Sequence, residues 1–164
     1  MKNYRPLLVV AAISLIISAC VLENPSGNTT PTADLYFTVI DDNGTPLPNA
    51  QIYLFSFESS YLSYISSNPN GDPDITPSLG SDDVGITTAS GTATFFDRTL
   101  DGNAYQSGEI WYNRPNPIYY RVQAQVDNGG TIEYLTNDGG DFKLTFPELE
   151  SGERVVETLE IVVR

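Results

Sequence analysis

The residue types that most enzymes use for acid–base or nucleophilic catalysis are scarce in this chain. Its 164 residues include no histidine and a single cysteine, Cys20. Without histidine, a Ser-His-Asp or Cys-His site and a zinc-histidine cluster cannot be built. The 21 acidic residues would allow a glycosidase pair, but no spacing in the sequence places two carboxylates opposite each other. We therefore expect a protein that is not an enzyme.

The best candidate for a metal site is a polar segment after residue 67. Asn68, Asn70, Asp72 and Asp74 recur at every second residue, and Gly71 allows a sharp bend between them. Ca²⁺ takes six to eight oxygen ligands, which such acidic loops provide. The glutamate that would end a loop of the EF-hand kind is missing, so a solvated acidic turn is the alternative. Calcium is the one cofactor that this sequence suggests.

Aromatic residues form the second candidate site. They are Trp111, Tyr112, Tyr119 and Tyr120. If exposed, these rings would stack on a sugar face or hold a peptide. The alternative is that they belong to the core, because the tryptophan of a β-sandwich often packs between its sheets.

The first twenty residues have the pattern of an export signal. Lys2 and Arg5 precede an apolar run, 7–17, that is too short to span a bilayer. The run ends in Ile-Ser-Ala-Cys at 17–20, which resembles the bacterial lipobox. This resemblance implies cleavage before Cys20 and lipidation of its sulfur. We expect a lipoprotein signal peptide at 1–19, the lipidated cysteine with a flexible tether at 20–33, and one domain at 34–164.

Lipidation would determine where the protein lies. Two or three acyl chains give lasting membrane attachment, so we expect anchoring in the bacterial cell envelope, at the outer membrane, with either the periplasmic or the surface side open. Removing residues 1–19 takes away two cations and no acids, which changes the net charge from −13 to −15. Such an acidic domain should be repelled by nucleic acid and by anionic lipid headgroups. With Cys20 lipidated, the domain has no disulfide.

Strand patterns dominate the rest of the chain. Apolar and polar residues alternate over 35–40 and 50–55, which flank a turn rich in Pro, Gly and Asp. Further strands are expected at 86–88, 92–97, 118–126, 131–136, 142–146 and 155–163, with 108–112 open as a short extra strand. The residues at 127–130 and 137–140 predict tight hairpins into 131–136 and 142–146. In 118–126 the polar residues predict one solvent-exposed face. The pattern predicts an all-β fold, an antiparallel β-sandwich of seven to eight strands with immunoglobulin-like or prealbumin-like topology.

One long insertion, 58–85, interrupts this pattern. It is longer than ordinary connections in compact domains. The aromatic and aliphatic residues at 61–65 predict either a short extra strand or a helical turn packed over one end of the sandwich. No segment after the signal peptide has a convincing amphipathic helical pattern.

The turn between the first two strands carries a resemblance to known domains. Val39, Asp41, Gly44, Pro46, Leu47, Ala50, Ile52 and Leu54 match the opening of carboxypeptidase regulatory-like, Cna protein B-type and transthyretin-like (prealbumin-like) β-sandwich domains. The segment 87–95 resembles the second hallmark of that group, a hairpin. The resemblance implies the β-sandwich fold but no single function, because such domains serve as stalks, accessory modules and adhesin repeats. The lysine and asparagine of the Cna-type isopeptide bond are missing from the expected strands.

These observations lead to one main functional hypothesis and two alternatives. The main one is a non-enzymatic, envelope-anchored lipoprotein that acts as a binding, adhesion or structural module. The first alternative is a calcium-stabilised, carbohydrate-binding accessory lipoprotein of a glycan-uptake system. The second is pairing with another envelope protein through an exposed sheet edge. The expected partners are therefore the membrane through the lipid anchor and an envelope protein or glycan, with nucleic acid excluded.

Overall fold

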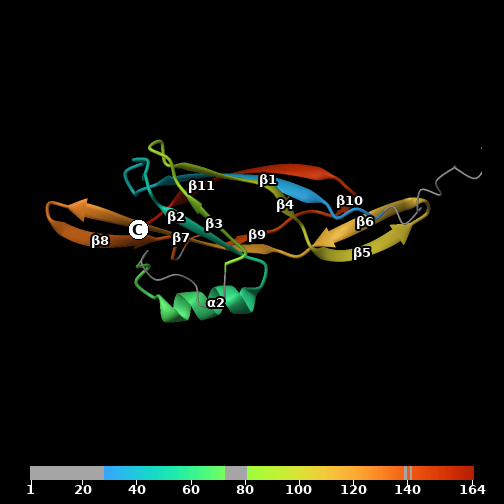
Figure 1. The fold of residues 1–164 in the computed structure, drawn as a ribbon, viewed down its shortest axis with the longest axis horizontal. Coiled ribbons are helices and arrows are strands. Elements are labelled where there is room, and N and C mark those ends of the chain that lie inside the picture. The colour runs from blue at the N-terminus through green and yellow to red at the C-terminus, as the bar shows by residue number, and fades with distance from the viewer. Residues whose placement is uncertain (1–27, 73–80, 139, 141) are drawn as a thin grey trace, which may run out of the picture.

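The computed structural model describes residues 28–72, 81–138, 140 and 142–164, and in this part of the chain the fold is a β-sandwich with one helix (Figure 1). The predicted signal peptide, Cys20 and Asp74 lie outside the described residues. The elements in chain order are β1 (Thr32–Ile40), β2 (Gln51–Phe55), α2 (Glu58–Ser67), β3 (Asp83–Ile86), β4 (Thr92–Thr99), β5 (Gly102–Ser107), β6 (Ile110–Pro115), β7 (Ile118–Asn128), β8 (Thr131–Thr136), β9 (Lys143–Leu144), β10 (Leu149–Glu150) and β11 (Arg154–Val162).

Two sheets form the body of the sandwich. One has the strand order β11-β1-β4, and the other has the order β3-β2-β7-β8 with β9 paired to β7. Their facing side chains make one hydrophobic core, to which β1 contributes Leu35, Phe37 and Val39 and β7 contributes Tyr120 and Val122. The alternation seen in the sequence produces this arrangement, because every second side chain of a strand points to the same face. The all-β class predicted from the sequence is confirmed.

A third, small sheet extends the molecule at one end. It has the order β10-β6-β5, and Leu149 of β10 is buried in the main core. The β7–β8 hairpin projects at the opposite end (Figure 1). Its two-residue connection, Gly129 and Gly130, has positive φ at both positions, which matches the twist of the flanking strands. The hairpin predicted at 127–130 is therefore confirmed.

The turn after β1 forms as its sequence predicts. Oδ1 of Asp41 accepts hydrogen bonds from the backbone N–H groups of Asn43 and Thr45, both at 2.8 Å. Gly44 has a φ of +79°, which side chains rarely adopt. These hydrogen bonds stabilise the charged carboxylate and hold the pKa of Asp41 below its usual value, with the bond from Thr45 as the largest cause. The Asp-Asp-Asn-Gly motif is thus a structural turn.

One strand boundary and two strand pairings differ from the sequence predictions. β1 begins at Thr32, two residues inside the predicted tether, because Thr32 N donates to the carbonyl of Glu153 at 3.0 Å. The segment 87–95 does not join two paired strands, since β3 pairs with β2 while β4 pairs with β1 in the other sheet. β9 pairs with β7 and not with β8. Turn residues show where a chain bends, whereas sheet membership depends on distant partners.

The helix α2 is the main correction to the predicted elements. The sequence pattern predicted no convincing amphipathic helix, and the structure has one at Glu58–Ser67. It buries only Tyr61 and Tyr64, so its apolar stripe is too narrow to stand out by periodicity. The helical alternative for 61–65 is the one that forms. Within the described ranges, no helix is long and apolar enough to cross a membrane.

A buried carboxylate ties three strands together. Asp34 of β1 accepts a hydrogen bond from Asp97 N at 3.0 Å and is bound by the Arg154 guanidinium at 2.7 Å. Both contacts favour the charged form, and the bond from Asp97 is the larger cause that holds the pKa of Asp34 below its usual value. Because the pKa is lowered in the folded state, this stabilisation is complete above the unfolded value of about 4 and is lost as the pH falls through the folded value.

We therefore predict a specific acid sensitivity. The wild-type free energy of unfolding should fall as the pH drops below about 4, and Asp34→Asn should show a smaller fall over the same range. The measurement is urea unfolding at a series of pH values from 7 to 2. The exposed Asp101→Asn is the control and should keep the wild-type pH profile. A profile of Asp34→Asn that parallels the wild type would contradict the assignment.

Candidate functional site

The polar face of β7 is buried from Tyr119 to Gln123, contrary to the prediction of one solvent-exposed face over 118–126, whereas Gln125 on the same face is exposed. Arg121 and Gln123 both have an exposed fraction of 0%, and Tyr119 is also buried. The helix α2 and the turn that follows it cover this face of the five-stranded sheet (Figure 1). The insertion therefore places polar side chains in the interior, where each must find partners. This buried polar cluster is the most unusual feature of the described structure.

Aromatic packing holds α2 on the sheet. Tyr61 stacks on Phe142 with ring centroids 5.2 Å apart and also contacts Phe55 of β2. Tyr64 packs against Phe55 at 5.8 Å and against Tyr53 at 5.4 Å. These rings form a second hydrophobic cluster on the outer side of the sheet, separate from the main core. The helix thus has its own apolar anchor.

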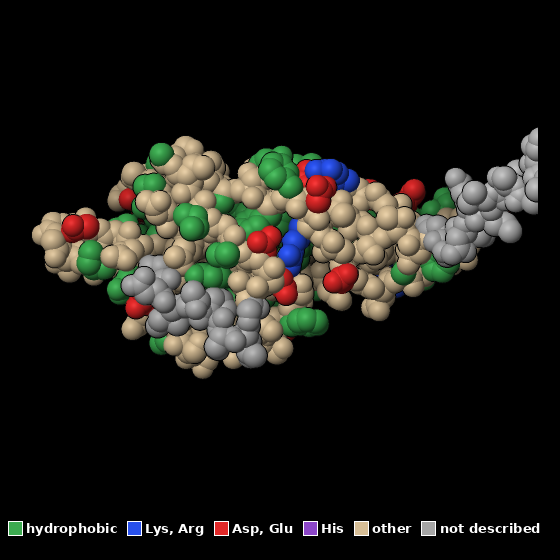
Figure 2. Space-filling view, viewed as in Figure 1, with side chains coloured by type: hydrophobic (Ala, Val, Ile, Leu, Met, Phe, Trp, Pro, Cys, Tyr) green, Lys and Arg blue, Asp and Glu red, His purple; other side chains and the backbone are tan. Residues whose placement is uncertain are grey.

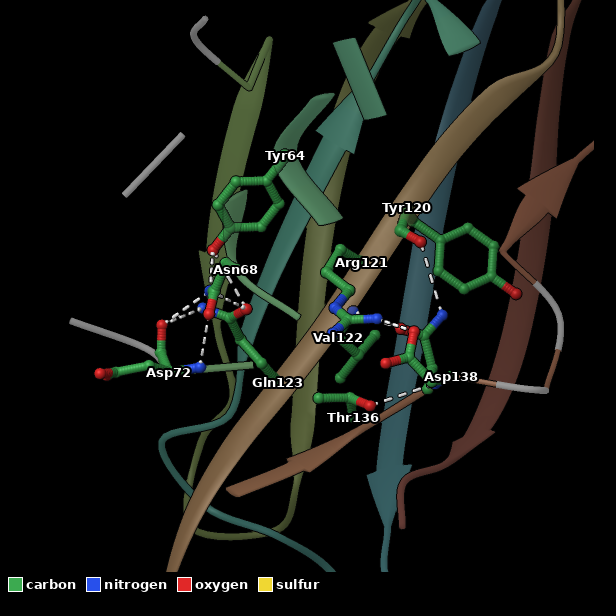
Figure 3. Close-up of polar contacts among 10 residues, drawn as sticks. Tyr64, Asn68, Asp72, Tyr120, Arg121, Val122, Gln123, Thr136 and Asp138 are labelled. Carbon is green, nitrogen blue, oxygen red and sulfur yellow. Dashed lines mark hydrogen bonds and ion pairs between the residues drawn. The ribbon is translucent and has the colours of Figure 1, made fainter. Parts of the chain in front are cut away.

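The turn after α2 is fixed to β7 by amide side chains (Figure 3). Asn68 is 1% exposed, and its Nδ2 donates to the Asp72 carbonyl at 2.9 Å and to the Tyr64 hydroxyl at 3.0 Å. Its Oδ1 accepts from Asp72 N at 2.9 Å. Gln123 of β7 accepts from the Tyr64 hydroxyl at 3.1 Å and donates to the Asp72 carbonyl at 3.3 Å. One amide network therefore closes the turn and joins it to the sheet.

Arg121 is the charged member of the cluster. Its Nη1 forms an ion pair with Asp138, whose side chain is 52% exposed. Within the described part of the chain, Nε and Nη2 of Arg121 have no hydrogen-bond partner. Figure 3 shows the guanidinium between β7 and the segment after β8 that carries Asp138. A buried cation that relies on one partly solvated carboxylate stabilises little overall, but it makes that carboxylate important.

A neighbouring asparagine fixes the segment that carries Asp138. Oδ1 of Asn137 accepts from Val122 N at 2.9 Å, and its Nδ2 donates to the Tyr120 carbonyl at 3.4 Å. Asn137 therefore continues the pairing with β7 after β8 ends at Thr136. This position keeps Asp138 next to Arg121.

Burial and hydrogen bonding shift the pKa values of several described acids and tyrosines. Burial raises the pKa of Tyr53 to about 12 and also raises the pKa of Tyr61, an effect that Arg121 partly opposes. On the surface, hydrogen bonds from Tyr105 and Arg114 lower the pKa of Glu148. These shifts move acids and tyrosines away from neutrality, whereas a general base or acid works best with a pKa near the operating pH.

Three of the four residues proposed for calcium, Asn68, Asn70 and Asp72, lie in the described part of the chain. The Asn68 amide is used in the turn, Asn70 is exposed and Asp74 lies outside the described residues. In the residues that the structure describes, no three histidine, cysteine, aspartate or glutamate side chains group so as to hold a metal ion. Figure 2 likewise shows acidic side chains at separate places on one face. Calcium binding at this turn stays a prediction.

The four aromatic residues proposed for ligand binding do not form one surface. Tyr120 is buried in the main core and Tyr119 in the cluster under α2, so neither ring can offer a face to a ligand. For these two residues the core alternative is the one that occurs, because the insertion covers one face of β7 and the opposite sheet covers the other. Trp111 and Tyr112 lie half-buried on β6 in the small sheet. There Tyr112 stacks on Tyr105 of β5, with centroids 5.7 Å apart.

The Arg121–Asp138 ion pair and the amide network of Gln123 were not predicted from the sequence. A signal for them was present in the aromatic residues at 53, 55 and 119, which occupy the strand positions opposite the core. Apolar rings on a face that is expected to be exposed indicate that something covers it. The tyrosines at 61 and 64 of the insertion, three residues apart, were the matching half of that contact.

The turn at Gly71 provides a test of how closely the insertion packs against Thr136 of β8. Gly71 has a φ of +71°, and a Cβ there would lie 2.0 Å from Cγ2 of Thr136. Gly71→Ala should therefore destabilise the protein by about 3 kcal/mol through backbone strain and overpacking. Gly129→Ala is the matched control, because its φ is +67° with nothing within 4 Å of the Cβ, so it should cost about 1 kcal/mol.

Urea unfolding of both variants would measure this difference. Equal losses for Gly71→Ala and Gly129→Ala would mean that the turn is not pressed against Thr136. The double variant Gly71→Ala/Thr136→Ser removes the clashing methyl group and should recover part of the loss.

Comparison with known proteins gives the chain a fold likeness and no family. No protein-family model matches it, and no curated protein matches its sequence. Similar solved structures include a candidate carbohydrate-binding protein from Pseudomonas aeruginosa, with 12% identity, a TM-score of 0.41 and coverage of 82% of this chain and 90% of that one. Another is chlorocatechol 1,2-dioxygenase from Pseudomonas putida, with 19% identity, a TM-score of 0.40 and 82% coverage of this chain, which spans 60% of that enzyme.

A third similar structure is the SpaB basal pilin from Lactobacillus rhamnosus GG, with 12% identity, a TM-score of 0.33 and coverage of 83% of this chain and 99% of the pilin. At identities this low, a shared fold does not carry over a ligand or a reaction. The function of this chain must therefore be argued from its own residues.

Proposed function

We propose that this protein is a non-enzymatic binding or structural module that a lipid on Cys20 anchors to the bacterial cell envelope. The observation that carries the non-enzymatic part is the use made of the buried polar residues. Asn68 and Gln123 serve to fix the insertion on the five-stranded sheet, and Arg121 forms an ion pair with Asp138 in the segment after β8. A catalytic group must instead keep an atom free to reach a substrate.

The fold also suits a membrane-anchored role. Thr29 contacts the β10–β11 turn through hydrogen bonds with Ser151 and Gly152, so the described chain begins at the end that carries the small sheet. Seven residues lie between Cys20 and Asn28, so the eight steps from one to the other span at most about 28 Å when fully extended. A lipid on Cys20 would therefore keep the small sheet near the bilayer and direct the β7–β8 hairpin away from it (Figure 1).

Detergent partitioning of the full chain expressed in bacterial cells tests the anchor. The wild type should enter the detergent-rich phase of Triton X-114, and Cys20→Ser should move to the aqueous phase. Ser18→Thr, which leaves Cys20 in place, is the control. If Cys20→Ser stays in the detergent phase as fully as the wild type, the lipid anchor is refuted. Protease treatment of intact cells then shows whether the domain faces outward.

A second candidate function is carbohydrate binding, with calcium as a stabilising ion. The observation that favours it is the pair Tyr105 and Tyr112 on the small sheet, flanked by Arg114, which lies 4.9 Å from the Tyr105 ring. Partly exposed aromatic rings beside a charged group are a common sugar-binding arrangement. A glycan array should then detect binding by the wild type that Tyr112→Ala abolishes. A melting temperature that is equal in calcium and in chelator would remove the calcium part.

A further inference from the structure

The strand β11 forms a long, regular edge of the sandwich. Its nine residues pair in parallel with β1 from Arg154 to Val162 without a shift in register. In the described part of the chain, no strand pairs along its other side. Natural proteins usually protect such edges with charged side chains, proline or a bulge. β11 contains no proline and no bulge, and its charged residues are Arg154, Glu157 and Glu160. The opposite edge strand, β4, does have an irregular register, with positive φ at Asp97.

The backbone direction along this edge can be assigned from its C-terminal end. Val163 N donates to the Ile40 carbonyl after β1, whereas Arg164 exchanges two hydrogen bonds of 2.9 Å with Thr136 on the other side. Backbone N–H and C=O groups of successive strand residues point to alternate sides. The groups that point away from β1 therefore belong to Arg154, Val156, Thr158, Glu160 and Val162.

The outer edge already accepts one antiparallel contact. The reciprocal hydrogen bonds between Thr136 and Arg164 have the form of an antiparallel pair. A hollow of about 200 Å³ continues from there along Glu160–Val162, between β11 and the residues 137, 138 and 140. The inward side chains Val155 and Leu159 pack on the core but are only partly buried. An added antiparallel strand would satisfy the outward backbone groups and cover these two side chains.

Charge identifies the kind of strand that fits. β11 carries Glu160 on its outer face and Glu157 on the face of Leu159, with Arg154 at its start, and the whole chain has a net charge of −13. A second copy of the chain would bring the same negative charge to the edge, whereas lysine or arginine side chains would be attracted. We propose that the outer edge of β11 binds an extended segment of a partner protein, with alternating basic and apolar residues, as an added antiparallel strand. This proposal gives the binding module a partner class, and it does not depend on the lipid anchor.

The test uses a nine-residue synthetic peptide of alternating lysine and valine with blocked ends. Three matched peptides serve as controls: the same sequence with every second amide N-methylated, one with glutamate in place of lysine, and one with a central proline. Binding to the protein is followed by calorimetry and by hydrogen exchange in NMR spectra. The N-methylated peptide keeps charge and side chains but loses the hydrogen bonds of one edge.

The proposal predicts which amides respond. Without peptide, the N–H groups of Arg154, Val156, Thr158, Glu160 and Val162 should exchange fast, and those of Glu157 and Leu159 slowly. The lysine–valine peptide should slow exchange at the first group, and the N-methylated peptide should bind at least about tenfold more weakly. Equal binding of the N-methylated or glutamate peptide, or binding without this protection pattern, would overturn the proposal. Protection that grows with protein concentration in the absence of peptide would show a second copy as the occupant and would also overturn it.

A variant provides an independent measurement. Thr158→Pro removes an N–H that points away from β1 and should keep the β1–β11 pairing, since proline is tolerated at such edge positions. It should retain the wild-type circular dichroism spectrum and lose peptide binding at least about tenfold. Peptide binding by folded Thr158→Pro at the wild-type level would contradict the proposed site. If this variant does not fold, the comparison of the four peptides on the wild type still decides the question.

Discussion

Asp138→Ala should destabilise the protein by about 3 kcal/mol, because it leaves a buried cation without a counterion. The Arg121 side chain has no exposed surface, and Asp138 provides its ion pair. The reverse change, Arg121→Met, should cost only about 1 kcal/mol. It fills a similar volume with an apolar side chain and leaves a carboxylate that is half exposed and can be hydrated. Urea unfolding of the two variants at neutral pH measures this asymmetry.

The double variant Arg121→Met/Asp138→Ala separates the buried charge from other effects of Asp138. Once the cation is absent, removing Asp138 should add almost nothing, so the double variant should be more stable than Asp138→Ala alone. Glu133→Ala, which changes an exposed acid on β8, controls for the general loss of negative charge. Equal losses in the Asp138→Ala and Arg121→Met variants would contradict the view that the uncompensated cation is the main cost.

Tyr61→Ala should have a still larger effect, about 4 kcal/mol, because it removes the central ring of the cluster under α2. Tyr61 is buried and contacts Phe55, Tyr119 and Phe142. Its loss would leave a cavity between the helix and the sheet and would also expose Arg121 to water. Thermal and urea unfolding monitored by far-ultraviolet circular dichroism would measure the change.

Leu62→Ala is the control for Tyr61→Ala. Leu62 follows Tyr61 on α2 but is 49% exposed, so its truncation should stay within about 0.5 kcal/mol of the wild type. A similar loss in the two variants would mean that helix propensity and not packing on the sheet keeps α2 in place. Together with the Asp138 variants, this comparison tests whether the insertion is an integral part of the fold.

The insertion limits where the proposed binding surfaces can lie. By covering the outer face of β2 and β7, α2 removes one of the two broad sheet surfaces, whereas Tyr36, Phe96 and Val156 stay exposed on the outer face of the other sheet. The small sheet at one end, the β7–β8 hairpin at the other and the edge of β11 remain accessible (Figure 1). The proposed sugar and peptide contacts use these remaining surfaces.

Local signals in the sequence were sufficient for much of the fold. Alternation over 35–40 and 118–126 predicted two central strands, because burial of one face imposes a period of two on any strand. The turn at Asp41 and the hairpin at Gly129 were predicted from residues that accept positive φ or hydrogen-bond their own backbone. The absence of histidine likewise limits the chemistry of this chain whatever fold it adopts.

Only the tertiary structure determined which faces are exposed. The two-residue alternation distinguishes the two faces of β7. It does not show whether a segment about fifty residues earlier in the chain covers the polar face. The burial of Arg121 and Gln123 depends on where Tyr61, Tyr64 and Asn68 lie after folding. The same holds for Tyr119 and Tyr120, which the sequence allowed as ligand-binding rings. Burial is a property of contacts between distant segments, and a local pattern records only the part of it that repeats along one strand.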